Sequence, residues 1–205
     1  MPVSECRIEQ TPGQRDFKKE KNPILRDELL KIVEECGKPK DLYTALVLTG
    51  GEPLLQVDFL KSFLPAVKQK GWTVYLETNG TLPNNLAEVI DYTDIIALDI
   101  KLPSATGLTN YFKEHELSLK TAAYQKVFVK IVYTAETKAK EVAEAAALVS
   151  NVDAEIPLVL QPAAPAGKIR HLPPPELAFS LQAVARRKLK NVRVIPQMHK
   201  LLGVL

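Results

Sequence analysis

The 205-residue sequence has few cysteines, no long apolar runs and little excess charge. Each of these features excludes certain classes of protein. Two cysteines, Cys6 and Cys36, argue against a disulfide-stapled fold and suit a reducing cytoplasm. No apolar stretch approaches the roughly 20 residues that cross a bilayer, and the N-terminus lacks the layout of a signal peptide. With 27 basic and 24 acidic residues, the net charge of +3 gives no argument for nucleic acid. We therefore expect a cytoplasmic protein with no membrane or nucleic-acid partner.

Two phosphate-binding signatures are also missing from the sequence. It contains neither a Gly-x-Gly-x-x-Gly motif nor a phosphate loop, so dinucleotide or triphosphate binding has no support. The remaining composition, 46% hydrophobic and 25% charged, is that of an ordinary globular protein, and the length suits one domain with a sizeable core. We divide the chain into a polar N-terminal loop region, residues 1–22, and a single domain, residues 23–205.

Apolar segments of strand length alternate with segments of helical periodicity along the chain. Strands are expected at 43–49, 73–76, 94–101, 127–132, 158–161 and 192–195, and helices at 23–36, 57–70, 84–90, 137–150 and 174–190. Residues 103–125 are expected to be irregular or helical. This alternation, at a spacing of roughly 25–30 residues, indicates right-handed βαβ units and a parallel α/β sheet. Six strands fit either a partial barrel or a flat doubly wound sheet, and the pattern does not separate the two.

Polar residues follow nearly every expected strand at its carboxyl end. They are Glu52 after the first strand, Glu77 and Asn79 after the second, Asp99 and Lys101 after the third, Gln161 after the fifth, and Gln197 and His199 after the last. The first strand also ends in Gly50-Gly51, whose missing Cβ atoms let a ligand approach the backbone. Because the carboxyl ends of parallel strands converge on one mouth, we expect these residues to form a single site.

The chemistry of this predicted site is dominated by hydrogen-bond acceptors. Its acids and amides suit an ammonium group, ribose hydroxyls or the edge of a heterocycle, and Lys101 and Lys130 can hold a carboxylate. The position of His199 after the last strand favours a functional role. His115 and His171 have no such context, and we expect both at the surface.

Several of these segments resemble the radical S-adenosylmethionine enzymes. Thr49-Gly50-Gly51-Glu52-Pro53 looks like the motif with which that family holds the amino group of the ligand's methionine part, and Glu77–Gly80 and Asp99–Lys101 sit where the family places further contacts. The ending Ile195–Gly203, together with Gln161-Pro162, resembles the 7-carboxy-7-deazaguanine synthase family. The resemblance extends from about residue 40 to the C-terminus.

The resemblance implies a radical enzyme of queuosine and 7-deazapurine biosynthesis. In its full-length form it reduces S-adenosylmethionine at a [4Fe-4S] cluster and, with Mg²⁺, converts 6-carboxy-5,6,7,8-tetrahydropterin to 7-carboxy-7-deazaguanine. It also implies a homodimer and an electron donor such as a flavodoxin. By match, S-adenosylmethionine contacts fall to Gly50, Gly51, Glu52, Glu77, Asn79, Asp99 and Lys101, and pterin contacts to Gln161, Gln197 and His199.

The sequence departs from the family at the cluster. The family binds iron on a Cys-x-x-x-Cys-x-x-Cys loop after the first barrel strand, and this chain has no such loop, so no catalytic residue, cluster ligand or magnesium ligand is assigned. The chain reads as if it starts one or two residues after that loop. We therefore expect a partial (β/α)6 barrel without its first strand. Either the count of six includes one strand too many or one strand lies outside the barrel, and the weakest of the six, 192–195, is the candidate for flanking the sheet.

Two other functions remain open at this point. An activase for a glycyl radical enzyme shares Gly-Gly-Glu-Pro and an Asp-x-Lys strand end, although the Gln-x-His-Lys ending speaks against it. The third interpretation is a clusterless, non-catalytic remnant that binds a nucleoside-like ligand.

Overall fold

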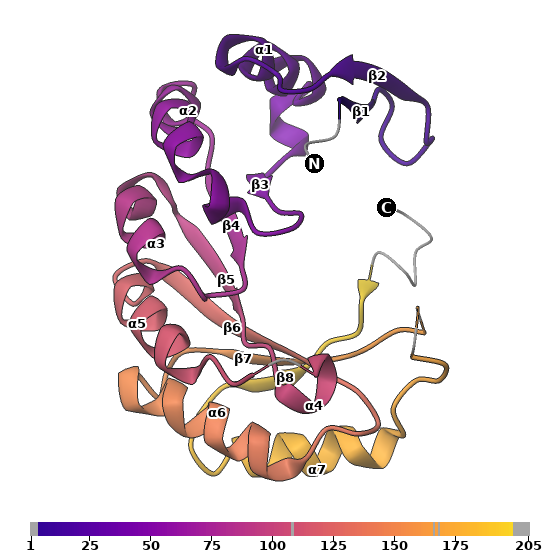
Figure 1. Cartoon of the computed structure of the whole chain (residues 1–205), viewed down its shortest axis with the longest axis vertical. Helices are drawn as coiled ribbons and strands as arrows, with labels where there is room; N and C mark the ends of the chain where they lie inside the picture. The colour runs from indigo at the N-terminus through magenta and orange to yellow at the C-terminus, as the bar shows by residue number, and fades with distance from the viewer. Residues whose placement is uncertain (1–3, 108, 166, 168, 199–205) are drawn as a thin grey trace.

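The molecule is built on one parallel sheet whose strands follow each other in chain order (Figure 1). The computed structural model describes residues 4–107, 109–165, 167 and 169–198. The six strands of the sheet are β3 (Leu46–Leu48), β4 (Val74–Thr78), β5 (Ile95–Asp99), β6 (Lys126–Tyr133), β7 (Leu158–Pro162) and β8 (Val192–Val194). Every neighbouring pair is parallel. Among the described residues β3 pairs only with β4 and β8 only with β7, so the sheet is an open, partial barrel.

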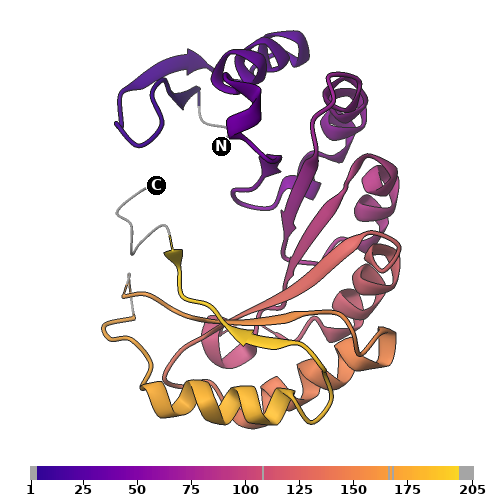
Figure 2. The same ribbon diagram turned by 180° about the vertical axis from the view of Figure 1, so that it is seen from behind.

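All six expected strands therefore belong to the sheet. The expectation that 192–195 flanks it is wrong, because Val192 pairs with Leu158 and Val194 with Leu160 in parallel register. The segment reads weakly in the sequence because β8 is only three residues long and its middle residue, Arg193, is exposed. The predicted α/β partial barrel is confirmed, with its open side between β3 and β8 (Figure 2).

Helices cover the outer face of the curved sheet (Figures 1 and 2). They are α1 (Arg26–Cys36), α2 (Val57–Gln69), α3 (Pro83–Val89), α4 (Pro103–Thr106), α5 (Phe112–Ala122), α6 (Ala139–Val152) and α7 (Pro175–Ala185), with the 3-10 turns η1 (Lys40–Leu42), η2 (Pro53–Gln56) and η3 (Ile90–Tyr92). Helix α1 begins three residues after the expected Pro23, with Leu25 as its N-cap residue. No helix in the described part of the chain has the length and apolarity needed to span a membrane.

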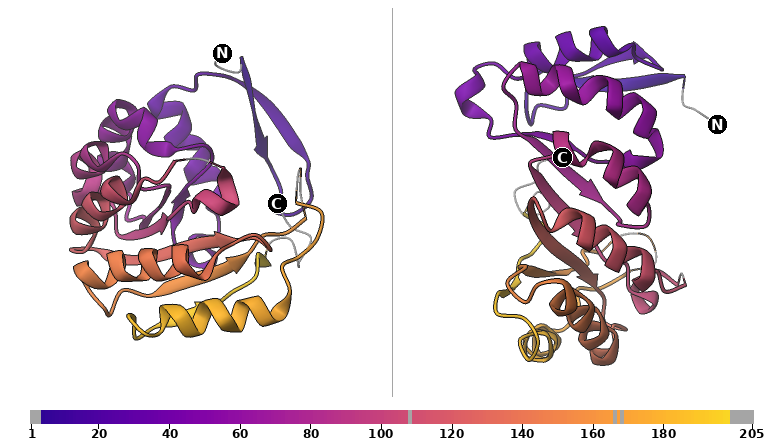
Figure 3. Two further views of the ribbon diagram at one scale, coloured as in Figure 1. Left: turned by 60° about the horizontal axis from the view of Figure 1, so that its bottom comes forward. Right: turned by 90° about the vertical axis from the view of Figure 1, so that its left-hand side faces the viewer.

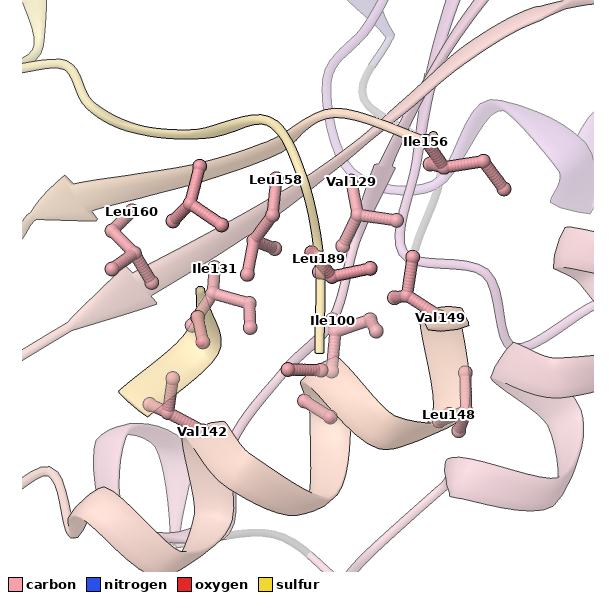
Figure 4. Close-up of a cluster of buried hydrophobic side chains, with 14 of the residues drawn as sticks. Ile100, Val129, Ile131, Val142, Leu148, Val149, Ile156, Leu158, Leu160 and Leu189 are labelled. Carbon is pink, nitrogen blue, oxygen red and sulfur yellow. The ribbon is translucent and has the colours of Figure 1, made fainter. Parts of the chain in front are cut away.

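Successive side chains of each strand point to opposite faces of the sheet, so one set forms the core and the other lies on the inner face. Side chains such as Leu76, Leu98 and Val129 point outward and are fully buried under the helices. Figure 4 shows one of the two resulting clusters, in which the β6 and β7 side chains Ile131 and Leu158 lie among residues of α6. The alternate positions of the same strands face the inner side, and that side is where charged residues are found.

The N-terminal region is not the loop that its polar composition predicts. Strands β1 (Glu5–Glu9) and β2 (Phe17–Lys21) form an antiparallel hairpin outside the six-stranded sheet (Figure 3). In its register Arg7 lies opposite Lys19, and Lys19 Nζ is 2.9 Å from Glu5 Oε2 in an exposed ion pair across the hairpin. Apolar alternation, the usual strand signal, is limited to Cys6 and Ile8 in β1 and is absent from β2, so pattern reasoning missed the hairpin.

Candidate ligand-binding site

The loop after β3 has a backbone conformation that requires glycine. Gly50 and Gly51 have φ angles of +89° and +55°, in the left-handed region that side-chain-bearing residues rarely adopt. A Cβ atom at either position would meet nothing within 4 Å, so the space beside this backbone is open. The two glycines therefore present main-chain atoms at the carboxyl end of the strand.

Glu52 joins this loop to the loop that follows β4. Its Oε1 accepts hydrogen bonds from Leu54 N at 3.1 Å and from Thr78 Oγ1 at 2.9 Å. Its Oε2 accepts from Asn79 N at 2.7 Å. The acid expected to face a ligand thus also has a structural role, because three protein donors converge on its carboxylate and fix the relative position of two strand-end loops.

A cleft of about 130 Å³ opens at the carboxyl ends of β3, β4 and β5. Its walls are Thr49, Gly50, Gly51, Glu77, Thr78, Asn79, Asp99, Lys101 and Lys130. Six of the seven residues predicted to contact S-adenosylmethionine line it, and Glu52 lies behind them. Lys130 reaches the same cleft from β6, because positions 77, 99 and 130 share the inner face of the sheet.

Charges of both signs meet within this cleft. Asp99 Oδ2 lies 2.6 Å from Lys101 Nζ and 3.6 Å from Lys130 Nζ, and Lys130 Nζ is 3.7 Å from Glu77 Oε2. The second Asp99 oxygen, Oδ1, is buried and has no partner among the described residues. An unpaired buried carboxylate oxygen is costly, so the Asp99 carboxylate depends on the ion pairs that its other oxygen makes with Lys101 and Lys130.

Tyr75 extends the inner face below the cleft. Burial, with a smaller contribution from the Glu77 charge, raises the pKa of Tyr75 to about 12. The ring lies 6.3 Å from that of Phe128 on β6, measured between centroids. Tyr75 therefore stays protonated at neutral pH, and sequence reasoning missed it because its side chain reads as part of a buried strand.

Larger hollows lie elsewhere on the molecule, and two of them exceed 500 Å³. One, of about 580 Å³, lies between α3 and α5, and another, of about 610 Å³, lies beside the hairpin and α1. The smaller cleft differs from these two in having the part-buried, oppositely charged side chains of Asp99 and Lys130 at its wall, together with the open Gly50-Gly51 backbone. The charged side chains at its wall thus favour the smaller cleft as the ligand site.

The chain is similar to known proteins in both sequence and fold. The model of the radical SAM superfamily matches residues 10–126. The 7-carboxy-7-deazaguanine synthase of Geobacter sulfurreducens is 41% identical over 206 residues, which cover all of this chain and 81% of the relative. That of Methanocaldococcus jannaschii is 31% identical over 97% of this chain and 82% of the relative.

The chain belongs to the 7-carboxy-7-deazaguanine synthase family of radical SAM proteins. Solved structures agree at the level of the fold. A domain of pyruvate-formate lyase-activating enzyme from Bacteroides vulgatus has a TM-score of 0.59 and 17% identity, over 75% of this chain and 99% of that domain. TYW1 with a lysine-pyruvate adduct bound has a TM-score of 0.51 and 16% identity, over 78% of this chain and 54% of TYW1. At these identities the likeness extends to the fold alone.

The family's iron–sulfur cluster does not fit the residues of this chain. The sequence holds two cysteines, Cys6 in β1 and the exposed Cys36 at the end of α1, where the cluster needs three thiolates. Within the described ranges no three His, Cys, Asp or Glu side chains gather in a way that could hold a metal ion. Neither the cluster nor Mg²⁺ therefore has a ligand set among these residues.

The residues matched to the family's pterin side lie apart from the cleft. Gln161 sits on the inner face at the end of β7, half-buried, and does not line the cleft. Gln197 is half-buried, and its Oε1 is buried without a partner among the described residues. His199 lies outside the described residues.

His115 is buried, contrary to the surface position expected for it. Its exposed fraction is 0%, and its Nε2 lies 3.0 Å from the carbonyl oxygen of Asn79. The surface prediction rested on the absence of a strand end beside His115, whereas the residue lies on the buried face of α5 with Ser118, Leu119 and Ala122. His171 is exposed, as expected.

Proposed function

We propose that this chain forms the S-adenosylmethionine- and substrate-binding part of a 7-carboxy-7-deazaguanine synthase. The reaction is the conversion of 6-carboxy-5,6,7,8-tetrahydropterin to 7-carboxy-7-deazaguanine. The identity of 41% to a synthase across the whole chain supports the substrate class. The single observation that carries the cofactor assignment is the cleft at the strand ends, where the Gly50-Gly51 backbone lies with the charged side chains of Glu77, Asp99, Lys101 and Lys130.

The cleft suits the methionine end of S-adenosylmethionine. Complete ligand sites typically measure 300–1,000 Å³, so a cleft of about 130 Å³ takes only part of the molecule. That part carries an ammonium and a carboxylate group, which match the mixed charges of Glu77 and Lys130. In this assignment Glu77, Asn79 and the Gly50-Gly51 backbone bind the aminoacyl end.

Asp99, Lys101 and Glu52 complete the proposed cofactor contacts. The Asp99 carboxylate faces a ligand hydroxyl or ammonium group, and Lys101 Nζ holds its Oδ2 at 2.6 Å. Glu52 acts mainly by fixing the loops that carry Gly51 and Asn79. Gln161, Gln197 and His199 serve the pterin, for which the buried Oε1 of Gln197 offers an acceptor.

The chain's own contribution is binding, orientation and exclusion of water. An iron–sulfur cluster supplies the electron for cleavage of S-adenosylmethionine, and its three thiolates have to come from residues that this sequence does not contain. We assign turnover to a form extended with a Cys-x-x-x-Cys-x-x-Cys loop. For that form we infer Mg²⁺, a flavodoxin-type electron donor and a homodimer.

The test uses the protein extended upstream to include the cluster loop, reconstituted without oxygen. Incubation with S-adenosylmethionine, a reductant and 6-carboxy-5,6,7,8-tetrahydropterin should give 7-carboxy-7-deazaguanine, detected by mass spectrometry. The matched variant Asp99→Asn should reduce product formation, whereas the exposed Asp91→Asn should not. A loaded extended enzyme that cleaves S-adenosylmethionine without making this product would contradict the synthase assignment and favour a different substrate.

A further inference from the structure

Helix α5 contacts the loop that follows β4 through two buried side chains. His115 Nε2 lies 3.0 Å from the Asn79 carbonyl oxygen, and Ser118 Oγ donates to the Gly80 carbonyl oxygen at 2.8 Å. Both side chains are 0% exposed. Their i, i+3 spacing puts them on one face of the helix, so two consecutive carbonyl groups of the loop are each held by α5.

The contact defines the protonation of His115. A carbonyl oxygen can only accept, so Nε2 carries the hydrogen and donates it to Asn79. Nδ1 is buried and has no partner among the described residues, and burial lowers the pKa of the ring. His115 is therefore neutral, in the Nε2–H form.

The loop is packed tightly at this contact. Gly80 has a φ angle of +69°, and a Cβ atom there would lie 2.9 Å from Leu98 Cδ2 and 3.1 Å from His115 Cδ2. Contacts closer than about 3.4 Å force neighbours to move. The loop has no room to shift toward α5, and His115 closes that side.

The same Asn79 peptide region is held from the opposite side by Glu52. Asn79 N–H donates to Glu52 Oε2 at 2.7 Å, while the Asn79 carbonyl accepts from His115. The Asn79 side chain is ordered as well, because its Oδ1 accepts from Thr81 N and Thr81 Oγ1 at 2.9 and 2.6 Å. Asn79 lines the cleft, so its position decides the shape of the cleft wall.

We propose that His115 and Ser118 are positioning residues that clamp the loop Thr78–Thr81 and thereby set the geometry of the S-adenosylmethionine cleft. The ligand named here rests on the proposed function above. Neither side chain lines the cleft, so both act through Asn79 and Gly80. Helix α5 is coupled in this way to a site that it does not touch.

The test compares variants that differ in one hydrogen bond. His115→Gln keeps an N–H donor near the position of Nε2, His115→Leu removes it at similar volume, and Ser118→Ala removes the second donor. Thr121→Ala is the matched control, because Thr121 Oγ1 bonds only to Leu117 O within α5. Leu119→Ala is the control for lost stability, since this α5 side chain is fully buried in the hydrophobic core.

Two measurements are made on each variant: hydrogen exchange of the Asn79, Gly80 and Thr81 amides, and affinity for S-adenosylmethionine. His115→Leu should speed exchange of these amides and weaken binding by about tenfold, the loss expected for one unpaired buried partner. Ser118→Ala should show a smaller change in the same direction. His115→Gln should stay within about threefold of the wild type, and the two control variants should leave both readouts unchanged at the loop.

Each other outcome counts against the inference. If His115→Leu and Leu119→Ala change exchange and affinity alike, the role of His115 is structural only. If His115→Gln fails to rescue, donation from Nε2 is not what matters. A wild-type chain that binds no S-adenosylmethionine would overturn the proposed ligand, while the exchange data would still decide whether α5 clamps the loop.

Discussion

Replacing Glu52 by glutamine removes one acceptor from the joint between the β3 and β4 loops. The wild-type carboxylate accepts from Leu54 N, Thr78 Oγ1 and Asn79 N at 3.1, 2.9 and 2.7 Å. The glutamine carbonyl can still serve Leu54 and Thr78, but its NH₂ group then faces the N–H of Asn79. The glutamine NH₂ and the Asn79 N–H are both donors, so the charge-assisted hydrogen bond between the carboxylate and Asn79 is lost. The Asn79 N–H is then unpaired.

The magnitude follows from that single lost acceptor. Losing a charge-assisted hydrogen bond and leaving a part-buried donor unpaired lowers the free energy of unfolding by about 1.5–3 kcal/mol. For a chain of this size, roughly 2–4 °C per kcal/mol corresponds to a fall in Tm of roughly 3–12 °C. Affinity for S-adenosylmethionine should fall as well, since Asn79 lines the cleft.

Thermal unfolding followed by circular dichroism measures the change. Glu88→Gln is the matched control, because Glu88 is an exposed carboxylate paired with Lys61 between α3 and α2, and such pairs contribute little. The reasoning is refuted if Glu52→Gln melts together with Glu88→Gln and the wild type. It would also be refuted if Glu52→Gln lost stability with unchanged affinity, since the two loops would then be independent of the ligand site.

Three further predictions concern the cleft, the pH dependence and the core. Asp99→Asn should weaken S-adenosylmethionine binding by about tenfold in titration calorimetry, because Oδ1 or its replacement no longer offers a charged acceptor, and an unchanged Kd would rule out this contact. Burial lowers the pKa of His115 in the folded state below its ordinary value of 6.5, and weaker opposing contributions come from the Asn79 carbonyl, Glu114 and Asp99. The unfolded chain therefore binds a proton at His115 at a higher pH than the folded chain does. The free energy of unfolding is thus full above pH 6.5 and falls as the pH drops below it. Urea unfolding at pH 7.5 and 5.5 should show this loss in the wild type and a smaller one in His115→Gln, and equal losses would contradict it. Leu158→Ala should cost about 2–5 kcal/mol of unfolding free energy, because this fully buried residue leaves a cavity between β7 and α6, with S-adenosylmethionine affinity of the folded protein unchanged.

Much of the sheet was predictable because its strands are short apolar runs stopped by glycine or polar residues. Val74–Thr78 and Ile95–Asp99 both end where the charged cleft begins, so one pattern locates the strand and the site. Even the three-residue β8 was found, although its membership of the sheet was doubted. Pairing of Val192 with Leu158 is a long-range contact that the local sequence does not encode.

The features that the sequence did not predict share a physical cause: each depends on contacts between residues that are distant in sequence. The β1–β2 hairpin is stabilised by cross-strand charges such as Lys19 and Glu5, which look like solvated residues in sequence. His115 is buried because its acceptor, the Asn79 carbonyl, lies 36 residues away. Glu52 likewise meets Thr78 and Asn79 only in the folded chain.

The central claim is that S-adenosylmethionine binds in the cleft formed by the β3, β4 and β5 ends. Titration of the isotopically labelled chain, followed by amide chemical shifts, tests it most directly. Gly50, Gly51, Asn79 and Gly80 should shift in a saturable way, while Gly13 in the hairpin turn and Gly71 after α2, both in similar left-handed turns, should not. Shifts confined to the groove between α3 and α5, or no shifts at the amides of Gly50, Gly51, Asn79 and the adjacent Gly80, would contradict the claim.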